Sequence, residues 1–178
     1  LGILRAQTTQ RVKDINPSES SFPSRFHGLN GVLYFMANDG TTGQELWKSD
    51  GTEAGTGLVK DLDPTGGALP EYLTTFNGML YFAAFDGVNG KELWKSDGTA
   101  AGTTLVKDIN PTGPALLNQL IVFNGSLYFR ADDGIHGLEL WKTDGTAAGT
   151  VLVKDINPAG DSFFSDPYVS NGSLYFRA

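Results

Sequence analysis

The chain has 178 residues, of which 23 are glycine and 8 are proline. Because it contains no cysteine, a disulfide framework, a thiolate zinc site and a cysteine nucleophile are excluded. Its 20 acidic and 13 basic residues give a formal charge of −7, which argues against nucleic acid as a partner. Apolar residues make up 40% of the sequence without any run long enough for a bilayer span, and Leu1–Gln7 does not have the pattern of a signal peptide.

The sequence is a tandem repeat with a period of 47 residues. The three tryptophans, Trp47, Trp94 and Trp141, are separated by this interval, and the blocks around them repeat with it. Between residues 77–111 and 124–158, 27 of 35 positions are identical. A match of this kind over an unbroken period indicates tandem duplication of one structural unit.

Each unit contains four strand signals and no helical period. The first strand ends at Asn77-Gly78, a dipeptide that supplies the two positive φ angles of a type I′ hairpin turn. The fourth ends before Pro111, which cannot donate to a sheet ladder. In the second unit the strands are expected at Tyr72–Phe76, Leu80–Phe85, Glu92–Lys95 and Thr104–Ile109.

Four short antiparallel strands in a repeat of this length predict an all-β fold, a β-propeller of about four blades, with a β-solenoid as the alternative. The chain then forms a single propeller or a propeller fragment. Its parts are a closing strand at 9–16, blades at 22–63, 69–111 and 115–158, and a partial fourth blade at 162–178. Either both ends of the chain complete the fourth blade, with Leu1–Arg5 in place of a missing strand, or the ring is completed by another copy or by further sequence.

The block E-L-W-x-x-D-G-T-x-x-G-T occurs at Glu45–Thr56, Glu92–Thr103 and Glu139–Thr150. It resembles a bacterial tandem-repeat family named after this string, and the resemblance covers nearly all of residues 9–178. The resemblance implies propeller-type arrays in large bacterial proteins that are secreted or attached to the cell surface. It implies no reaction that could be transferred to these positions.

An Asp-Gly pair follows the second strand of each unit, at Asp39, Asp86 and Asp133. These aspartates are candidate calcium ligands, because carboxylate oxygens in loops are what calcium prefers. The favoured interpretation is turn chemistry, in which an aspartate before glycine accepts hydrogen bonds from backbone N–H groups two residues further on. No cofactor is therefore expected, with calcium as the open alternative.

The tryptophans are candidates for sugar-stacking platforms, but a place on a strand inside the unit favours packing between neighbouring units. The Glu and Lys residues that flank each Trp, and the Lys-Asp pair of the fourth strand, are expected to form exposed cross-strand ion pairs.

The loop after the second strand keeps the pattern Asp-Gly-x-x-Gly in all three units, and the two residues between the glycines differ from unit to unit. These variable residues are the candidate ligand-binding positions. They are Thr41 and Thr42, Val88 and Asn89, and Ile135 and His136. The two histidines occupy non-equivalent positions, and no catalytic constellation is evident, so an enzyme is not expected.

The expected function is a non-enzymatic binding or scaffolding module that presents repeated loops multivalently to a glycan or another protein. The alternatives are a lectin-like propeller, self-assembly of copies through open blade edges or a shared blade, and, less favoured, an enzyme acting on polysaccharides.

Overall fold

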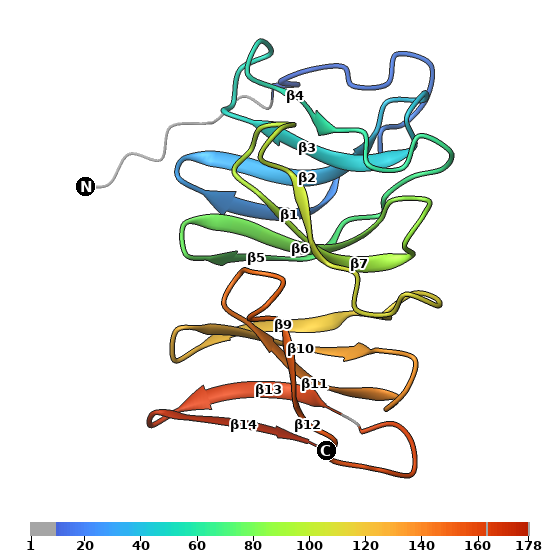
Figure 1. Cartoon of the computed structure of the whole chain (residues 1–178). Coiled ribbons are helices and arrows are strands. Elements are labelled where there is room, and N and C mark those ends of the chain that lie inside the picture. The colour runs from blue at the N-terminus through green and yellow to red at the C-terminus, as the bar shows by residue number, and fades with distance from the viewer. Residues whose placement is uncertain (1–9, 163, 178) are drawn as a thin grey trace, which may run out of the picture.

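The computed structural model describes residues 10–162 and 164–177, and this part of the chain contains strands and no helix. Within it, no segment therefore has the helical length and apolar character needed to cross a bilayer. Four antiparallel sheets follow one another along the chain (Figure 1). Each of them lies within one of the repeat ranges expected from the sequence.

The strands of each sheet are hydrogen-bonded in sequence order. The first sheet contains β1 (Ser24–Leu29), β2 (Val32–Asn38), β3 (Gln44–Ser49) and β4 (Gly57–Lys60). The second contains β5 (Glu71–Phe76), β6 (Met79–Phe85), β7 (Lys91–Ser96) and β8 (Thr104–Lys107). The third contains β9 (Asn118–Phe123), β10 (Ser126–Asp132), β11 (Leu138–Thr143) and β12 (Val151–Lys154), and the fourth is a hairpin of β13 (Ser165–Ser170) and β14 (Ser173–Arg177).

The Asn-Gly turns have the predicted geometry. Asn77 and Gly78, which join β5 to β6, have φ angles of 50° and 74°, and both central residues of a type I′ turn require positive values. The fourth strand is shorter than predicted, because β8 ends at Lys107. Its continuation leaves the ladder, since the N–H of Ile109 donates to the Glu92 carboxylate instead.

The sheets stack face to face in chain order through apolar side chains. Between the first and second sheets, Tyr34, Leu46 and Val59 pack with Phe82 and Trp94. The equivalent residues Tyr81, Leu93 and Val106 pack with Phe129 and Trp141 between the second and third sheets. The first strands also contact one another in succession, from β1 to β5, β9 and β13. These findings confirm an all-β fold of repeated four-stranded antiparallel sheets.

The two ends of the chain do not share a sheet in the described residues. Residues 10–16 form no strand, although 9–16 is the predicted closing strand, and Thr9 lies outside the described part. Lys13 Nζ instead donates to the Thr56 carbonyl at 2.7 Å, and Ile15 packs against Phe35 and Trp47 of the first sheet. In the fourth sheet β13 and β14 are paired only with each other. Leu1–Arg5 also falls outside the described residues.

Successive sheets contact each other at the glycine of the Asp-Gly-Thr turn. Gly98 has a φ of 89°, and a Cβ at this position would collide with the hydroxyl of Tyr34 from the preceding sheet. Gly51 has a similar φ of 91°, but no atom of the described residues lies within 4 Å of its Cβ position. A substitution at Gly51 therefore tests backbone strain alone, whereas the same substitution at Gly98 tests the strain together with the contact between sheets.

We expect Gly51→Ala to lower the free energy of unfolding by about 1 kcal/mol, because alanine is strained at positive φ. Gly98→Ala should cost roughly 1–3 kcal/mol more, because the added methyl group also displaces Tyr34. Denaturant unfolding of both variants measures the difference. Equal losses would show that the contact between Gly98 and Tyr34 contributes nothing to stability.

Candidate functional site

The loop between the second and third strands of each unit is built around one aspartate. In the second unit, Asp86 Oδ1 accepts hydrogen bonds from the N–H groups of Val88 at 2.9 Å and Asn89 at 2.7 Å. Its other oxygen accepts from the Asn89 amide at 2.6 Å. Asp39 and Asp133 bind the backbone of their own loops in the same way.

These aspartates are stabilised as anions. Partial burial works against the charged form of Asp86, but the N–H groups of Asn89 and Val88 outweigh it, so the pKa of Asp86 lies below its ordinary value. Asp39 and Asp133 also have lowered pKa values, for the same balance of causes. The geometry is that of the favoured turn chemistry. No group of three or more metal-ligating side chains suited to a metal ion occurs in the described residues, and calcium binding remains a prediction.

The variable loop residues are displayed at one end of their sheets, each pair on a separate sheet. Val88 is 86% exposed and Ile135 is 82% exposed, so both apolar side chains extend into solvent. Next to Ile135, the Nδ1 of His136 lies 2.8 Å from Asp133 Oδ2, and this hydrogen bond raises the pKa of His136. Thr41 is exposed and Thr42 is partly buried, and both of their hydroxyls donate to Asp39.

The tryptophans are buried and do not lie on the loop surface. Trp94 and Trp141 pack between two sheets, and Trp47 packs in a cluster of the first sheet that includes Ile15. Trp47, Trp94 and Trp141 are only 6%, 7% and 6% exposed. Lys60 Nζ of the first sheet lies 5.8 Å from the centroid of the Trp94 ring, a cation–π contact across the interface, and Lys107 is placed in the same way on Trp141. An indole enclosed in this way offers no free face to a sugar ring.

The glutamate before each Leu-Trp pair is fully buried, which is not apparent from the sequence. Glu45, Glu92 and Glu139 are all 0% exposed. Glu92 accepts hydrogen bonds from the N–H groups of Ile109 at 2.9 Å and Ala115 at 3.1 Å, at the two ends of the connection to the third sheet. The carboxylate thereby fixes the path of the chain from one unit to the next.

The expectation that these Glu and Lys residues form exposed cross-strand ion pairs is wrong. Lys48 and Lys95 donate to the carbonyls of Gly98 and Gly145 in the following sheet, at 2.8 and 2.9 Å. The lysines of the Lys-Asp pairs do the same, since Lys60 donates to Thr103 O and Lys107 to Thr150 O, each at 2.9 Å. Carbonyls of the next unit are better partners here than carboxylates, because the stacking of the sheets brings them within reach of the lysine.

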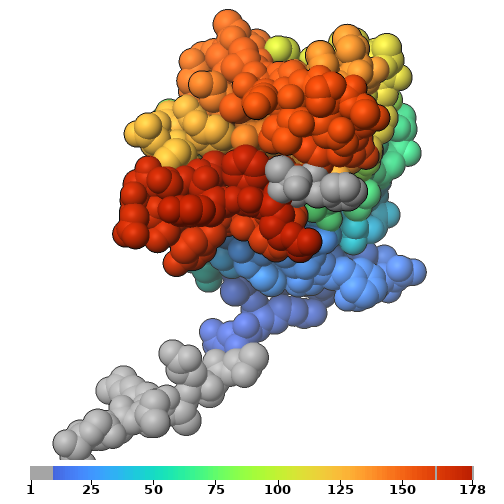
Figure 2. Space-filling view, turned by 90° about the horizontal axis from the view of Figure 1, so that it is seen from below, coloured from blue at the N-terminus to red at the C-terminus, as the bar shows by residue number. Residues whose placement is uncertain are grey.

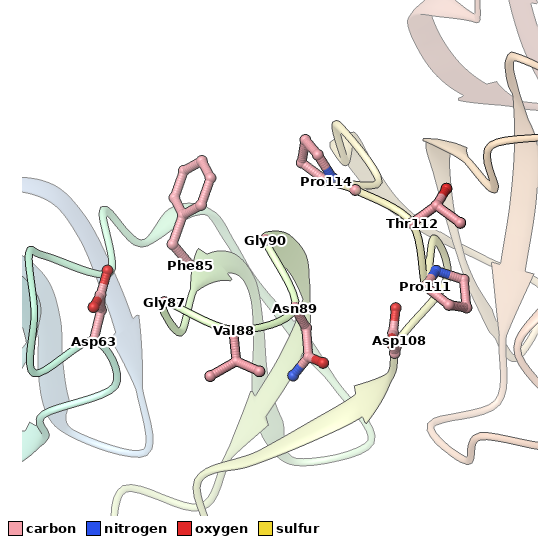
Figure 3. Close-up of a pocket in the computed structure, with 11 residues that line it drawn as sticks. Asp63, Phe85, Gly87, Val88, Asn89, Gly90, Asp108, Pro111, Thr112 and Pro114 are labelled. Atoms are coloured by element: carbon pink, nitrogen blue, oxygen red, sulfur yellow. The ribbon is translucent and has the colours of Figure 1, made fainter.

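A pocket of about 450 Å³ opens beside the second loop (Figure 3). Val88 and Asn89 contribute one wall, and the connection that leaves the second sheet contributes another with Asp108 and Thr112. Asp63 from the first unit, Phe85 and two prolines, Pro111 and Pro114, also line the pocket. Polar groups therefore surround an opening that also has an apolar surface.

Asp108 provides an unused acceptor in this lining. Within the described part of the chain, its Oδ1 is buried and makes no hydrogen bond, and the equivalent atoms of Asp61 and Asp155 have the same property. A buried acceptor without a donor is unfavourable by about 1–3 kcal/mol. Because the same atom is buried in all three units, this property belongs to the repeat and not to the pocket alone.

The buried glutamates predict a dependence of stability on pH. Burial raises the pKa of Glu92 to about 7 and the charge of Asp108 adds to this, while the N–H groups of Ile109 and Ala115 act in the opposite direction. The folded state therefore retains a proton that the unfolded state releases above the ordinary pKa of 4.5. This contribution to the free energy of unfolding falls as the pH rises from 4.5 to 7 and is constant above that range.

Glu92→Gln removes this titration. We expect the difference in unfolding free energy between the native chain and the variant to fall with rising pH, at a slope approaching about 1.4 kcal/mol per pH unit. Urea unfolding at several pH values between 5 and 8 measures it. The matched control is Glu53→Gln at an exposed turn, which should leave the slope unchanged. Parallel pH curves for the native chain and Glu92→Gln would contradict the assignment.

Trp94→Ala tests the structural role of the tryptophans. We expect a loss of about 3–5 kcal/mol of stability, because the substitution opens a cavity between two sheets. Val88→Ala, at an exposed position, should stay within about 0.5 kcal/mol of the native chain. Thermal or denaturant unfolding checks both, and near-native stability of Trp94→Ala would place the indole outside the core.

No family model matches this chain, and a search of curated proteins finds no match for its sequence.

Proposed function

We propose that this chain is a non-enzymatic binding module, a β-propeller-type array of repeat units that recognises a carbohydrate polymer through its loops. The pocket beside the second loop is the observation that carries the proposal. The face-to-face stacking of the sheets and the succession of contacts among their first strands support the propeller-type arrangement.

The pocket has the chemistry that a sugar requires. The Asp108 carboxylate can accept hydrogen bonds from sugar hydroxyls, the Asn89 amide can donate as well as accept, and Thr112 adds a hydroxyl. The Phe85 ring and neighbouring prolines offer an apolar surface to the C–H face of a pyranose. A few convergent polar groups beside an apolar wall are the usual composition of a small-ligand site.

The repeat extends this recognition to a polymer. The three aspartate-anchored loops have the same frame and lie on successive sheets, so one chain presents several related surfaces. When the ligand also repeats, weak contacts at each loop combine into a much higher overall affinity. The proposed secreted or surface location, implied by the repeat family that the sequence resembles, is where polysaccharides are encountered.

The arrangement of the carboxylates in the pocket supports a binding function over hydrolysis of a polysaccharide. Glycosidases commonly use two carboxyl groups as acid and base or nucleophile. Asp63 Oδ1 accepts hydrogen bonds from the N–H of Thr65 at 3.1 Å and from its hydroxyl at 2.7 Å, so this carboxylate stabilises its own turn. One oxygen of the second carboxylate in the pocket is thereby committed to the backbone and hydroxyl of Thr65.

The test is binding of the 178-residue chain to a panel of immobilised polysaccharides, with the matching short oligosaccharides as monovalent competitors. We expect one or more polymers to be retained, and the oligosaccharides to compete only at much higher concentration. Asn89→Ala and Asp108→Asn should each weaken binding about tenfold, the effect of losing about 1.4 kcal/mol of interaction.

Glu53→Ala is the control. Glu53 is exposed in the turn between β3 and β4 of the first sheet, at the end of that sheet opposite its β2–β3 loop. This variant should bind like the native chain. Retention of no polysaccharide, or unchanged binding by both pocket variants, would reject the proposal. Release of new reducing ends from a bound polymer would show that the module is an enzyme.

A further inference from the structure

The pocket beside the second loop contains one acidic side chain that departs from the repeat. Asp63 lines this pocket, and the residues at intervals of 47 from it are all asparagine, namely Asn16, Asn110 and Asn157. The lining residues belong to the second unit and to the connections on its two sides. The right-hand edge of Figure 2 runs from the blue and cyan first unit through green to the orange third unit, so the second unit has a complete sheet on each side.

The replacement of asparagine by Asp63 leaves one oxygen without a donor. Asp63 Oδ1 accepts from the N–H of Thr65 at 3.1 Å, as Asn157 Oδ1 accepts from the N–H of Ala159 at 3.3 Å. The amide nitrogen of Asn157 then donates to the carbonyl of Asp161 at 2.8 Å. Asp63 has an oxygen where asparagine has this nitrogen, and its Oδ2 accepts no hydrogen bond from the described residues. The side chain is only 8% exposed, so few waters can replace the missing donor.

A second carboxylate lines the same pocket from another direction. Asp108 belongs to the connection that leaves the second sheet, whereas Asp63 belongs to the connection that enters it. Figure 3 shows Val88 and Asn89 of the loop between the two carboxylates. A ligand that reaches both must therefore span the pocket, which is about 450 Å³ in volume and has room for a polyatomic molecule.

The charge of these carboxylates is not balanced within the lining. Of the described residues that line the pocket, none is a lysine or an arginine. The ammonium group of Lys91, which follows the lining residue Gly90, binds Glu71 instead. Opposite charges attract more strongly where solvent is partly excluded, so the pocket favours a positively charged group on its ligand.

We propose that this pocket binds the amino sugars of a carbohydrate polymer, with the protonated amine of one sugar at Asp63 and a hydroxyl group of its neighbour at Asp108. The proposal rests on the carbohydrate-binding function proposed above and specifies its ligand class. An ammonium group has three donors and no acceptor, which suits an oxygen that lacks a donor. A polymer with many amines is also attracted by a chain with a formal charge of −7.

The experiment compares two soluble ligands that differ only in charge. They are the β-1,4-linked hexamer of glucosamine and its fully N-acetylated counterpart, titrated into the 178-residue chain by calorimetry at a mildly acidic pH. We expect the glucosamine hexamer to bind at least about tenfold more tightly, because only its amines are charged. Added salt should reduce the difference, because ions screen the attraction.

Asp63→Asn locates the preference in the pocket. The variant introduces the residue that the other units have, so the fold accommodates it, and its thermal midpoint should be at least that of the native chain. We expect its affinity for the glucosamine hexamer to fall at least about tenfold, to that of the N-acetylated hexamer. The matched control is Glu53→Gln, which removes the same charge from an exposed turn of the first unit and should keep the preference.

Two kinds of failure are distinguishable. Equal affinity for the two hexamers, or binding of neither while other polysaccharides are retained, would overturn the proposed ligand class and leave the carbohydrate-binding function intact. An undiminished preference in Asp63→Asn would also overturn it, because general attraction of a polycation to an acidic chain would then explain the binding. Retention of no polysaccharide at all would reject both proposals.

Discussion

The arrangement of the repeat units depends on a buried carboxylate that binds the backbone between them. Glu92 accepts from the N–H of Ala115, and the carbonyl of Ala115 accepts in turn from the N–H of Asp132 in the next sheet, at 2.8 Å. A charged group with no solvent exposure is costly unless donors surround it. The backbone amides that satisfy Glu92 therefore cannot move away from it, which fixes where the following sheet begins.

The other contacts between units complete this constraint. The Glu92 carboxylate positions the connection, the lysines bind carbonyls of the next sheet, and the tyrosine hydroxyl packs against a glycine that has no side chain. All three use the backbone of the neighbouring unit as the partner. The variable loop residues do not take part, so their sequence can change without disturbing the stack.

This separation connects the fold with the proposed function. The aspartate of each loop uses one oxygen for the backbone of its own loop, which gives the loop a defined shape and leaves Val88 and Ile135 extended into solvent. The pocket forms where such a loop meets the connection positioned by the buried glutamate. The loop residues proposed to contact a ligand, such as Asn89, are thus positioned in part by the buried Glu92, which has no solvent exposure.

The sequence by itself determined the strands, the hairpin turns and the period, because alternating apolar residues and Asn-Gly pairs act locally. It also indicated the aspartate-anchored loops, whose hydrogen bonds span two or three residues. Only the tertiary structure decided that Glu92 is buried, that Lys95 reaches a carbonyl of the next sheet, and that Asp63 and Asp108 line one pocket. These groups lie 17 to 50 residues from their partners, and stacking of whole sheets brings them together.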